Sequence, residues 1–126
     1  MNRFWLKVPA ILYAALIFGL SSLSKTPLIK IPIWNIDKLV HLLEYMVFGV
    51  LLMLAFRSNL NGKAMRRSNL MSIIVGILYG ISDEIHQYFI PGRISSIEDL
   101  LADALGILLG VWLFNRLRIF QRYREA

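Results

Sequence analysis

The chain has 126 residues, of which 57% are hydrophobic and 17% are charged, and its mean hydropathy is +0.60. A soluble domain is nearer half apolar and about a quarter charged, so the composition excludes a soluble domain in which one small core hides the apolar residues. The net charge of +6 comes from basic residues at the ends of apolar runs, where anionic lipid lies, so we exclude a nucleic-acid-binding module. The lack of cysteine excludes disulfides and thiol catalysis.

The first of four apolar runs, Phe4 to Leu23, is close to the ~20 residues that a helix needs to cross a bilayer. Lys7 and Pro9 interrupt only its opening turns, where proline is tolerated. A cleaved signal peptide is the alternative, since the start is basic and small residues follow the run. We favour a membrane-spanning helix because the run is longer than a signal core and we expect no soluble domain after it.

The second run, Leu39 to Phe56, follows a segment, Lys25 to Asp37, that is long enough to lie across the mouth of a cavity or the membrane surface. On a helix, four polar side chains at the start of this run share a stripe of about 100°. They are Asp37, His41, Glu44 and Tyr45. A carboxylate that faces lipid in mid-helix costs at least ~2.5–3.5 kcal/mol, so we expect this stripe to face the other helices.

The third run, Leu70 to Ile90, carries a second polar stripe and ends at the turn signal Pro91-Gly92. The stripe holds Tyr79, Asp83, His86 and Gln87, with Glu84 to one side of it. Because the turn is short, we expect Arg93 to lie near the carboxylates.

The fourth run, Leu100 to Leu117, begins after two overlapping capping boxes, which predict a helix start. The pairs are Ser95 with Glu98 and Ser96 with Asp99. Asp99 and Asp103 lie one turn apart on this helix. Gly106 and Gly110 continue the same stripe and predict a seam of small residues where another helix packs closely.

The basic residues predict the orientation. Ten of the fourteen lie at the start of the chain, between the second and third runs, or after the fourth. By the positive-inside rule these parts, and both termini, face the cytoplasm. We therefore predict an all-α polytopic membrane protein, a single domain over residues 1–126 with four transmembrane helices. Seven of the eight acidic residues and both histidines fall in or near the outer half, where we expect an outward-opening polar cavity.

Three stretches carry a family resemblance: LSSLSKTPL, DKLVHLLEYMVFGVLL and SDEIHQYFIPGRISSIEDLLADALGILLG. Together they resemble the VanZ-like family of small bacterial membrane proteins. The resemblance implies a four-helix, multi-pass protein of the bacterial cytoplasmic membrane and a link to resistance to teicoplanin, an acylated glycopeptide. The family's motif positions fall here on Asp37, Lys38, His41, Glu44, Tyr45, Ser82, Asp83, Glu84, His86, Gln87, Arg93, Asp99 and Gly106.

Carboxylates and imidazoles ligate divalent cations and act as general acids and bases. The catalytic candidates are His41, Asp83, Glu84 and His86. The candidate ligands of a divalent cation are Asp37, His41, Asp83 and Glu84. The residues expected to bind a substrate or ligand are Asp37, Tyr45, Gln87, Arg93, Asp99 and Asp103. The sequence carries no His-Glu-x-x-His zinc arrangement, nucleophile elbow or phosphate loop.

Several functions remain open. The favoured one is a non-enzymatic envelope protein that binds a lipid head group or an amphiphile at the outer leaflet. The alternative is a membrane-embedded enzyme, dependent on a metal or on acid/base residues, that acts on a lipid-linked phosphate or ester. A channel or transporter comes third, and a polar network that only holds the helices together is the structural alternative. The sequence leaves the oligomeric state open.

Overall fold

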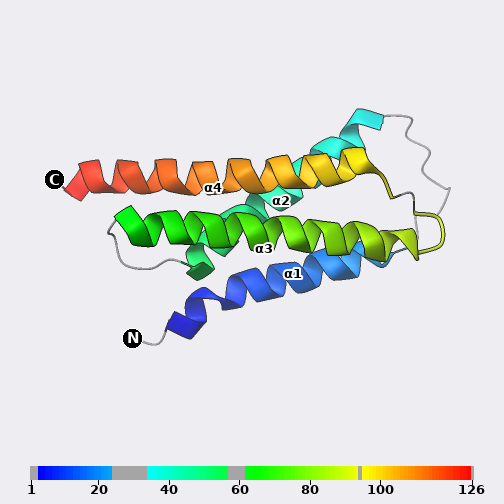
Figure 1. The fold of residues 1–126 in the computed structure, drawn as a ribbon, viewed down its shortest axis with the longest axis horizontal. Coiled ribbons are helices and arrows are strands. Elements are labelled where there is room, and N and C mark those ends of the chain that lie inside the picture. The colour runs from blue at the N-terminus through cyan, green and yellow to red at the C-terminus, as the bar shows by residue number, and fades with distance from the viewer. Residues whose placement is uncertain (1–2, 24–33, 57–61, 94, 126) are drawn as a thin grey trace.

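The structure, a computed structural model, describes residues 3–23, 34–56, 62–93 and 95–125. Within these ranges it is entirely helical: a 3-10 helix, η1 (Arg3–Leu6), precedes α1 (Val8–Ser21), α2 (Trp34–Phe56), α3 (Gly62–Tyr88) and α4 (Ile97–Glu125). Successive helices run in opposite directions, and both termini lie at one end of the bundle (Figure 1). The predicted all-α class is confirmed for this part of the chain. Residues 25–33, most of the segment expected to lie across the mouth of a cavity or the membrane surface, fall outside it.

Two helices are longer than the apolar runs that predicted them. Helix α3 begins at Gly62 rather than at Leu70, and α4 continues past Leu117 to Glu125. The added turns are rich in Lys, Arg and other residues that favour helix, but their polarity hides them from a criterion based on apolar length. Part of the predicted loop between the second and third runs is therefore helical.

The connection from α3 to α4 follows its predicted turn chemistry. Helix α3 ends at Tyr88, and Gly92 takes a φ of 81°, in the left-handed region that favours glycine. Before α4, the Ser96 hydroxyl accepts a hydrogen bond from the Asp99 amide at 3.1 Å, so Ser96 is the N-cap. The turn is thus held at both ends by residues that its sequence signals identified.

The predicted seam of small residues lies between α2 and α4. A Cβ added at Gly106 would lie 2.5 Å from the Leu42 carbonyl oxygen and 3.0 Å from the Met46 amide nitrogen. A Cβ at Gly110 would lie 3.0 Å from the Cα of Gly49. These neighbours are backbone atoms, so the two helices approach so closely only because glycine has no side chain.

Helix α1 is fixed to α2 and α3 by two tyrosines. The Tyr13 hydroxyl donates to the Glu44 carbonyl of α2 at 2.9 Å, and the Tyr79 hydroxyl of α3 donates to the Ala14 carbonyl of α1 at 2.5 Å. Both rings pack against Phe48, in the apolar core. The tyrosine rings thus add to the core while their hydroxyls tie the helices together.

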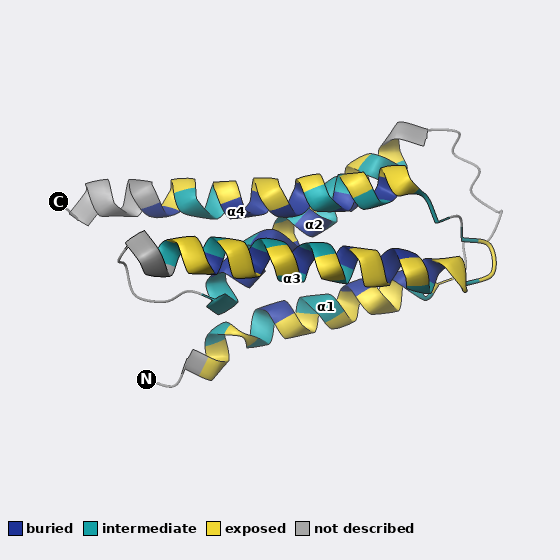
Figure 2. Cartoon of the chain, in the orientation of Figure 1, coloured by how far each residue is buried: buried dark blue, intermediate teal, exposed yellow. Residues whose placement is uncertain are grey.

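By length and composition, two helices of the described chain can cross a membrane: Phe4–Ser21 and Ile36–Phe56. Exposed residues occur on the outward faces of all four α-helices (Figure 2). The large hydrophobic ones include Leu12 and Leu16 of α1, Leu39 and Leu43 of α2, Ile74 and Leu78 of α3, and Leu101 and Leu105 of α4. Such extensive apolar surface is typical of a protein in contact with lipid.

Candidate functional site

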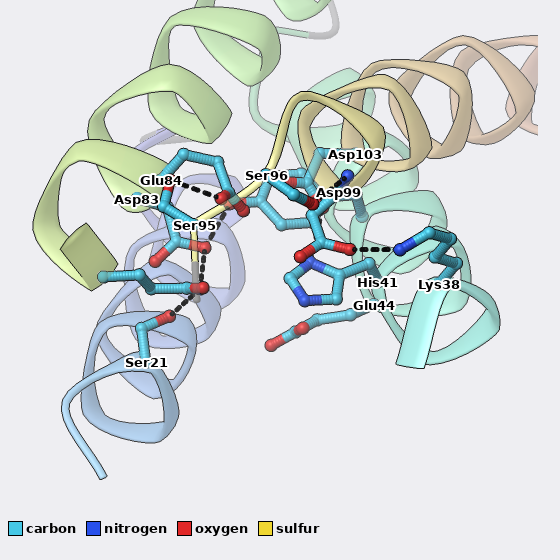
Figure 3. A network of polar contacts seen from close by, with 12 residues as sticks. Ser21, Lys38, His41, Glu44, Asp83, Glu84, Ser95, Ser96, Asp99 and Asp103 are labelled. Atoms are coloured by element: carbon cyan, nitrogen blue, oxygen red, sulfur yellow. Dashed lines mark hydrogen bonds and ion pairs between the residues drawn. The ribbon is translucent and has the colours of Figure 1, made fainter. Parts of the chain in front are cut away.

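A polar cluster fills one end of the bundle, where α1 connects to α2 and α3 to α4 (Figures 1 and 3). It joins side chains from the end of α1, the start of α2, the end of α3 and the start of α4. We use the name polar cluster for Ser21, Lys38, His41, Tyr45, Asp83, Glu84, Gln87, Ser95, Asp99 and Asp103. Most of these side chains are buried. The prediction that the polar faces of the second, third and fourth helices meet one another is thereby confirmed.

Helix α2 meets α4 through an imidazole and an ammonium group. The His41 Nδ1 lies 2.9 Å from Oδ1 of Asp103, and the two residues are 6% and 1% exposed. One turn earlier, the Lys38 Nζ lies 3.2 Å from Asp99 Oδ1 and 3.3 Å from Glu98 Oε2. Each buried α4 carboxylate therefore has a positively charged or protonatable partner on α2, which offsets part of the cost of its burial.

Helix α3 contributes Asp83, which is held by neutral donors. Its Oδ2 accepts from the Tyr45 hydroxyl at 2.8 Å and from the Gln87 amide at 3.4 Å. The same amide lies 3.4 Å from the Ser21 hydroxyl, which links α3 to α1. Asp83 is therefore a hub of the network that joins three helices.

Glu84 faces the start of α4 rather than standing apart from the polar stripe. Its Oε2 accepts from the Ser95 hydroxyl at 3.2 Å, and the residue is 5% exposed. Its other oxygen, Oε1, has no hydrogen-bond partner among the described residues, and the same holds for Oδ2 of Asp103. Two buried carboxylate oxygens in this cluster thus lack a donor, an arrangement that costs free energy unless a proton or a cation is shared there.

Two of the predicted site residues lie against α1. The His86 Nε2 is 2.9 Å from the Ser22 hydroxyl, and its ring stacks on Phe18 with centroids 4.6 Å apart. Arg93 donates from Nη2 to the Leu20 carbonyl at 2.7 Å and from Nε to the Leu23 carbonyl at 3.0 Å. Its guanidinium therefore caps the carboxyl end of α1, where a cation is stabilised by the exposed carbonyls.

An open groove of about 590 Å³ runs between α1 and α2 to the polar cluster. Its apolar walls include Leu16, Leu20, Val40, Leu43 and Val47. Its polar end is formed by Asp37, His41, Glu44, Gln87 and Arg93.

The residues predicted to bind a substrate or ligand divide into two sets of three. Asp37, Gln87 and Arg93 line the groove. Tyr45, Asp99 and Asp103 do not, because their side chains bond other helices in the interior of the bundle. The structure therefore brings only half of these residues to one surface that a ligand could reach.

Two groups of side chains could hold a metal ion, and both include His41. One group adds Asp37 and Asp99, and the other adds Glu84 and Asp103; in each, the candidate ligand atoms lie within 4.8 Å of one another. Asp83 belongs to neither group. Of the four ligands predicted from the sequence, the structure therefore brings His41 together with Asp37 in one group and with Glu84 in the other.

Three members of the polar cluster were not predicted as site residues: Ser21, which lies beside the Gln87 amide, Lys38 and Ser95. Lys38 matched only a family motif position, yet it pairs with both acids in the first turn of α4. Ser95 was expected only as a possible helix cap, yet its hydroxyl bonds Glu84. The spacing of Lys38 one turn before His41 could have placed it on the polar stripe, whereas nothing local to Ser95 points to a partner on α3.

The comparisons with known proteins agree with the resemblance drawn from the motifs. The profile of the VanZ/LLP1 family matches residues 4–120, which include the residues of the polar cluster. No curated protein and no solved structure matches the chain. Because the family profile covers well over half of the sequence, the chain belongs to the VanZ/LLP1 family.

Proposed function

We propose that all four helices cross the cytoplasmic membrane of a bacterium, with both termini inside and the polar cluster in the outer half. Helices α3 and α4 have 27 and 29 residues, or about 40 Å each at the usual helical rise, enough to span a bilayer. Their buried acids turn inward and large apolar side chains cover their outer faces, so their polarity does not oppose insertion.

The groove supports a role in binding an amphiphile. It is open along its side, between two helices that are apolar enough to cross a membrane, so an acyl chain could enter it from the lipid without passing through water. Its polar end then meets the head group. This combination of an apolar wall and a polar end in one groove is the observation on which the proposal rests.

The polar end favours a head group that donates hydrogen bonds. Asp37 and Glu44 supply carboxylate oxygens, while the Arg93 guanidinium already donates to carbonyls of the α1 end. Hydroxyl and ammonium groups match such acceptors. An acylated glycopeptide carries an acyl tail and a polar head, so the link to teicoplanin resistance that the resemblance implies is compatible with binding in this groove.

A photoactivatable phosphatidylethanolamine in nanodiscs, whose ammonium head group donates hydrogen bonds, tests the proposal. We expect cross-links, mapped by mass spectrometry, to concentrate on the groove, and Val47→Trp to reduce them by filling it. Leu78→Trp, on the exposed face of α3, is the matched control and should leave them unchanged. Teicoplanin should compete with the probe, and a de-acylated glycopeptide should not. Cross-links spread evenly over every lipid-facing surface would contradict the proposal.

A second candidate function has one specific observation in its favour. The His41 imidazole lines the groove while its Nδ1 is held by the buried Asp103 carboxylate, an arrangement that orients a histidine as a general acid or base. The protein would then be an enzyme acting on a lipid-linked phosphate or ester. Release of phosphate or acyl product by the purified protein, lost in His41→Gln, would favour this function over binding alone.

A further inference from the structure

We propose that His41, Glu84 and Asp103 form a binding site for zinc or a similar divalent transition-metal cation. The three residues come from α2, α3 and α4, and all are at least nine-tenths buried. Their candidate ligand atoms lie within 4.8 Å of one another. The site does not depend on whether the groove binds an amphiphile.

The unpartnered oxygens point to a ligand in this cluster. Glu84 Oε1 and Asp103 Oδ2 are buried without a hydrogen-bond partner among the described residues, although each carboxylate has a partner at its other oxygen. The Asp103 Oδ2 lies on the side of α3, 3.7 Å from where a Cβ on Gly80 would stand, and Gly80 is one turn before Glu84. A cation between the two carboxylates would satisfy both oxygens at once.

The distances suit a small divalent ion. Two ligands bound at about 2.1 Å to one ion lie about 2.9–3.4 Å apart in octahedral or tetrahedral geometry and never more than about 4.2 Å apart. His41 Nδ1 lies 2.9 Å from Asp103 Oδ1, so the imidazole already stands beside the carboxylate with which it would share the ion. Since no pair of candidate atoms is more than 4.8 Å apart, small side-chain adjustments bring all three within reach of one ion.

The donor set selects the kind of cation. An imidazole with two carboxylates suits zinc and its first-row neighbours, whereas calcium and magnesium prefer oxygen ligands alone. Three protein ligands also leave a coordination position open, as in zinc sites that bind a water or a substrate. His41 lines the groove and Glu84 lines a second hollow of about 340 Å³ beside Ser95, so two of the three ligands border space at the surface of the bundle.

The other group of candidate ligands is the weaker one. In it, Asp99 already pairs with Lys38 at 3.2 Å, and a lysine ammonium beside the carboxylate competes with a metal ion for the same oxygens. Among the described residues, neither Glu84 nor Asp103 has an ion pair with a lysine or an arginine. We therefore assign the metal to the group in which no ammonium or guanidinium competes for the carboxylates.

Zinc binding to the full-length protein tests the site. Protein purified in detergent and treated with chelator should take up one zinc ion per chain by native mass spectrometry and gain thermal stability. The isosteric changes Glu84→Gln and Asp103→Asn should each weaken zinc binding at least about tenfold. Glu98→Gln removes an exposed carboxylate at the same end of the bundle and should not weaken it.

The outcomes separate this proposal from the one on the groove. Val47→Trp should reduce phospholipid cross-linking and leave zinc uptake intact, whereas Glu84→Gln should do the reverse. X-ray absorption of the zinc-loaded protein should show a nitrogen and oxygen shell with one imidazole. If the wild-type protein takes up no zinc at micromolar concentrations, the proposed site is wrong, whether or not the variants fold. The site is also wrong if Glu84→Gln and Asp103→Asn leave zinc uptake unchanged.

Discussion

The Tyr45 hydroxyl lies in the interior of the bundle, where it donates to Asp83 Oδ2 at 2.8 Å and is fully buried. Interhelical hydrogen bonds in membrane proteins average only ~0.6 kcal/mol, because the separated helices find other partners. This one has a carboxylate acceptor, and the other donor to that oxygen, Gln87, is farther away at 3.4 Å. A bond to a buried carboxylate should therefore contribute more than the average.

We accordingly expect Tyr45→Phe to lower the free energy of unfolding by about 1–2 kcal/mol. The change removes the hydroxyl and keeps the ring that packs on Phe48. Reversible unfolding in detergent, followed by circular dichroism or steric trapping, measures the loss. Tyr88→Phe, at a side chain that is 74% exposed, is the control and should cost almost nothing. Equal stability of the two variants would mean that the Tyr45–Asp83 bond contributes nothing beyond packing.

Helical periodicity predicts which side chains face inward, but it does not predict their partners. It placed His41, Asp83 and Asp103 toward a common interior, and the contacts confirm this placement. Periodicity contains no information on the distance between two helices, so it could not pair His41 with Asp103 rather than with Asp83. Nor could it show that His86 would turn toward α1 and stack on Phe18, because that depends on how α1 is placed.

At the scale of the elements, two glycines of α4 determine how closely α2 and α4 approach each other. Gly106 and Gly110 leave no room for a side chain between α4 and the α2 backbone, and backbone atoms cannot move aside as a flexible side chain can. The same approach places Asp103, one turn before Gly106, within hydrogen-bonding distance of His41. The seam therefore determines the geometry of the polar cluster as well as the stability of the bundle.

Gly106→Ala should destabilise the protein by about 1–3 kcal/mol, the usual cost of forcing extra volume into a packed interface. The added Cβ would lie 2.5 Å from the Leu42 carbonyl oxygen, so α2 and α4 must separate. Gly19→Ala in α1 is a matched control, because a Cβ there meets nothing within 4 Å and alanine favours helix. The midpoint temperature of thermal unfolding should be lower for Gly106→Ala than for the wild type, and equal or higher for Gly19→Ala. The opposite order would contradict the close α2–α4 packing at Gly106.

Arg93 stabilises another element, the end of α1. Its guanidinium donates to the Leu20 and Leu23 carbonyls, which predicts that Arg93→Gln loosens that end. Hydrogen exchange followed by mass spectrometry should show faster exchange in the last turn of α1 and no change in the α2–α4 seam. Arg66→Gln, on the exposed start of α3 at the other end, should leave α1 unchanged. Unaltered exchange in α1 of Arg93→Gln would show that the cap is dispensable.

The helices themselves were predictable to different degrees. Apolar runs located all four, although in the described chain only Phe4–Ser21 and Ile36–Phe56 are apolar over a length that can cross a bilayer. Their ends were predictable only where a local signal exists, as at Ser96 and Gly92 before α4. The apolar pattern does not mark the start of α3 at Gly62 or the end of α4 at Glu125. A helix continues beyond its apolar run wherever the following residues favour helix.

On the scale of the whole molecule, charge is separated along the bundle. The polar cluster occupies the end where α1 connects to α2 and α3 to α4, while the termini lie at the opposite end (Figure 1). Seven of the eight acidic residues belong to the first end, and Arg66, Arg67 and Arg116 lie toward the second. Basic residues beside membrane spans are retained on the cytoplasmic side, so the separation favours one orientation of the bundle in a membrane.

This separation predicts the topology. Reporter fusions after Asn61 and at the C-terminus should report the cytoplasm, and a fusion after Lys30 should report the outside. Lys30 and Asn61 themselves fall outside the described residues, but each lies between two helices whose directions are known. Because the helices alternate in direction, the three reporters are not independent: if all four helices span the membrane, the first two must agree with each other and differ from the third.

The pattern of reporters therefore distinguishes two errors. If all three signals are reversed, four helices span the membrane in the opposite orientation, and the groove and the zinc site would open toward the cytoplasm instead. If the C-terminal reporter disagrees with the one after Asn61, α3 and α4 do not both cross the bilayer, and their exposed apolar faces must be covered by something other than lipid. Replacing Arg66 and Arg67 by glutamine tests whether these charges determine the orientation. If they keep the end of the bundle that carries the termini in the cytoplasm, the double variant should insert in both orientations.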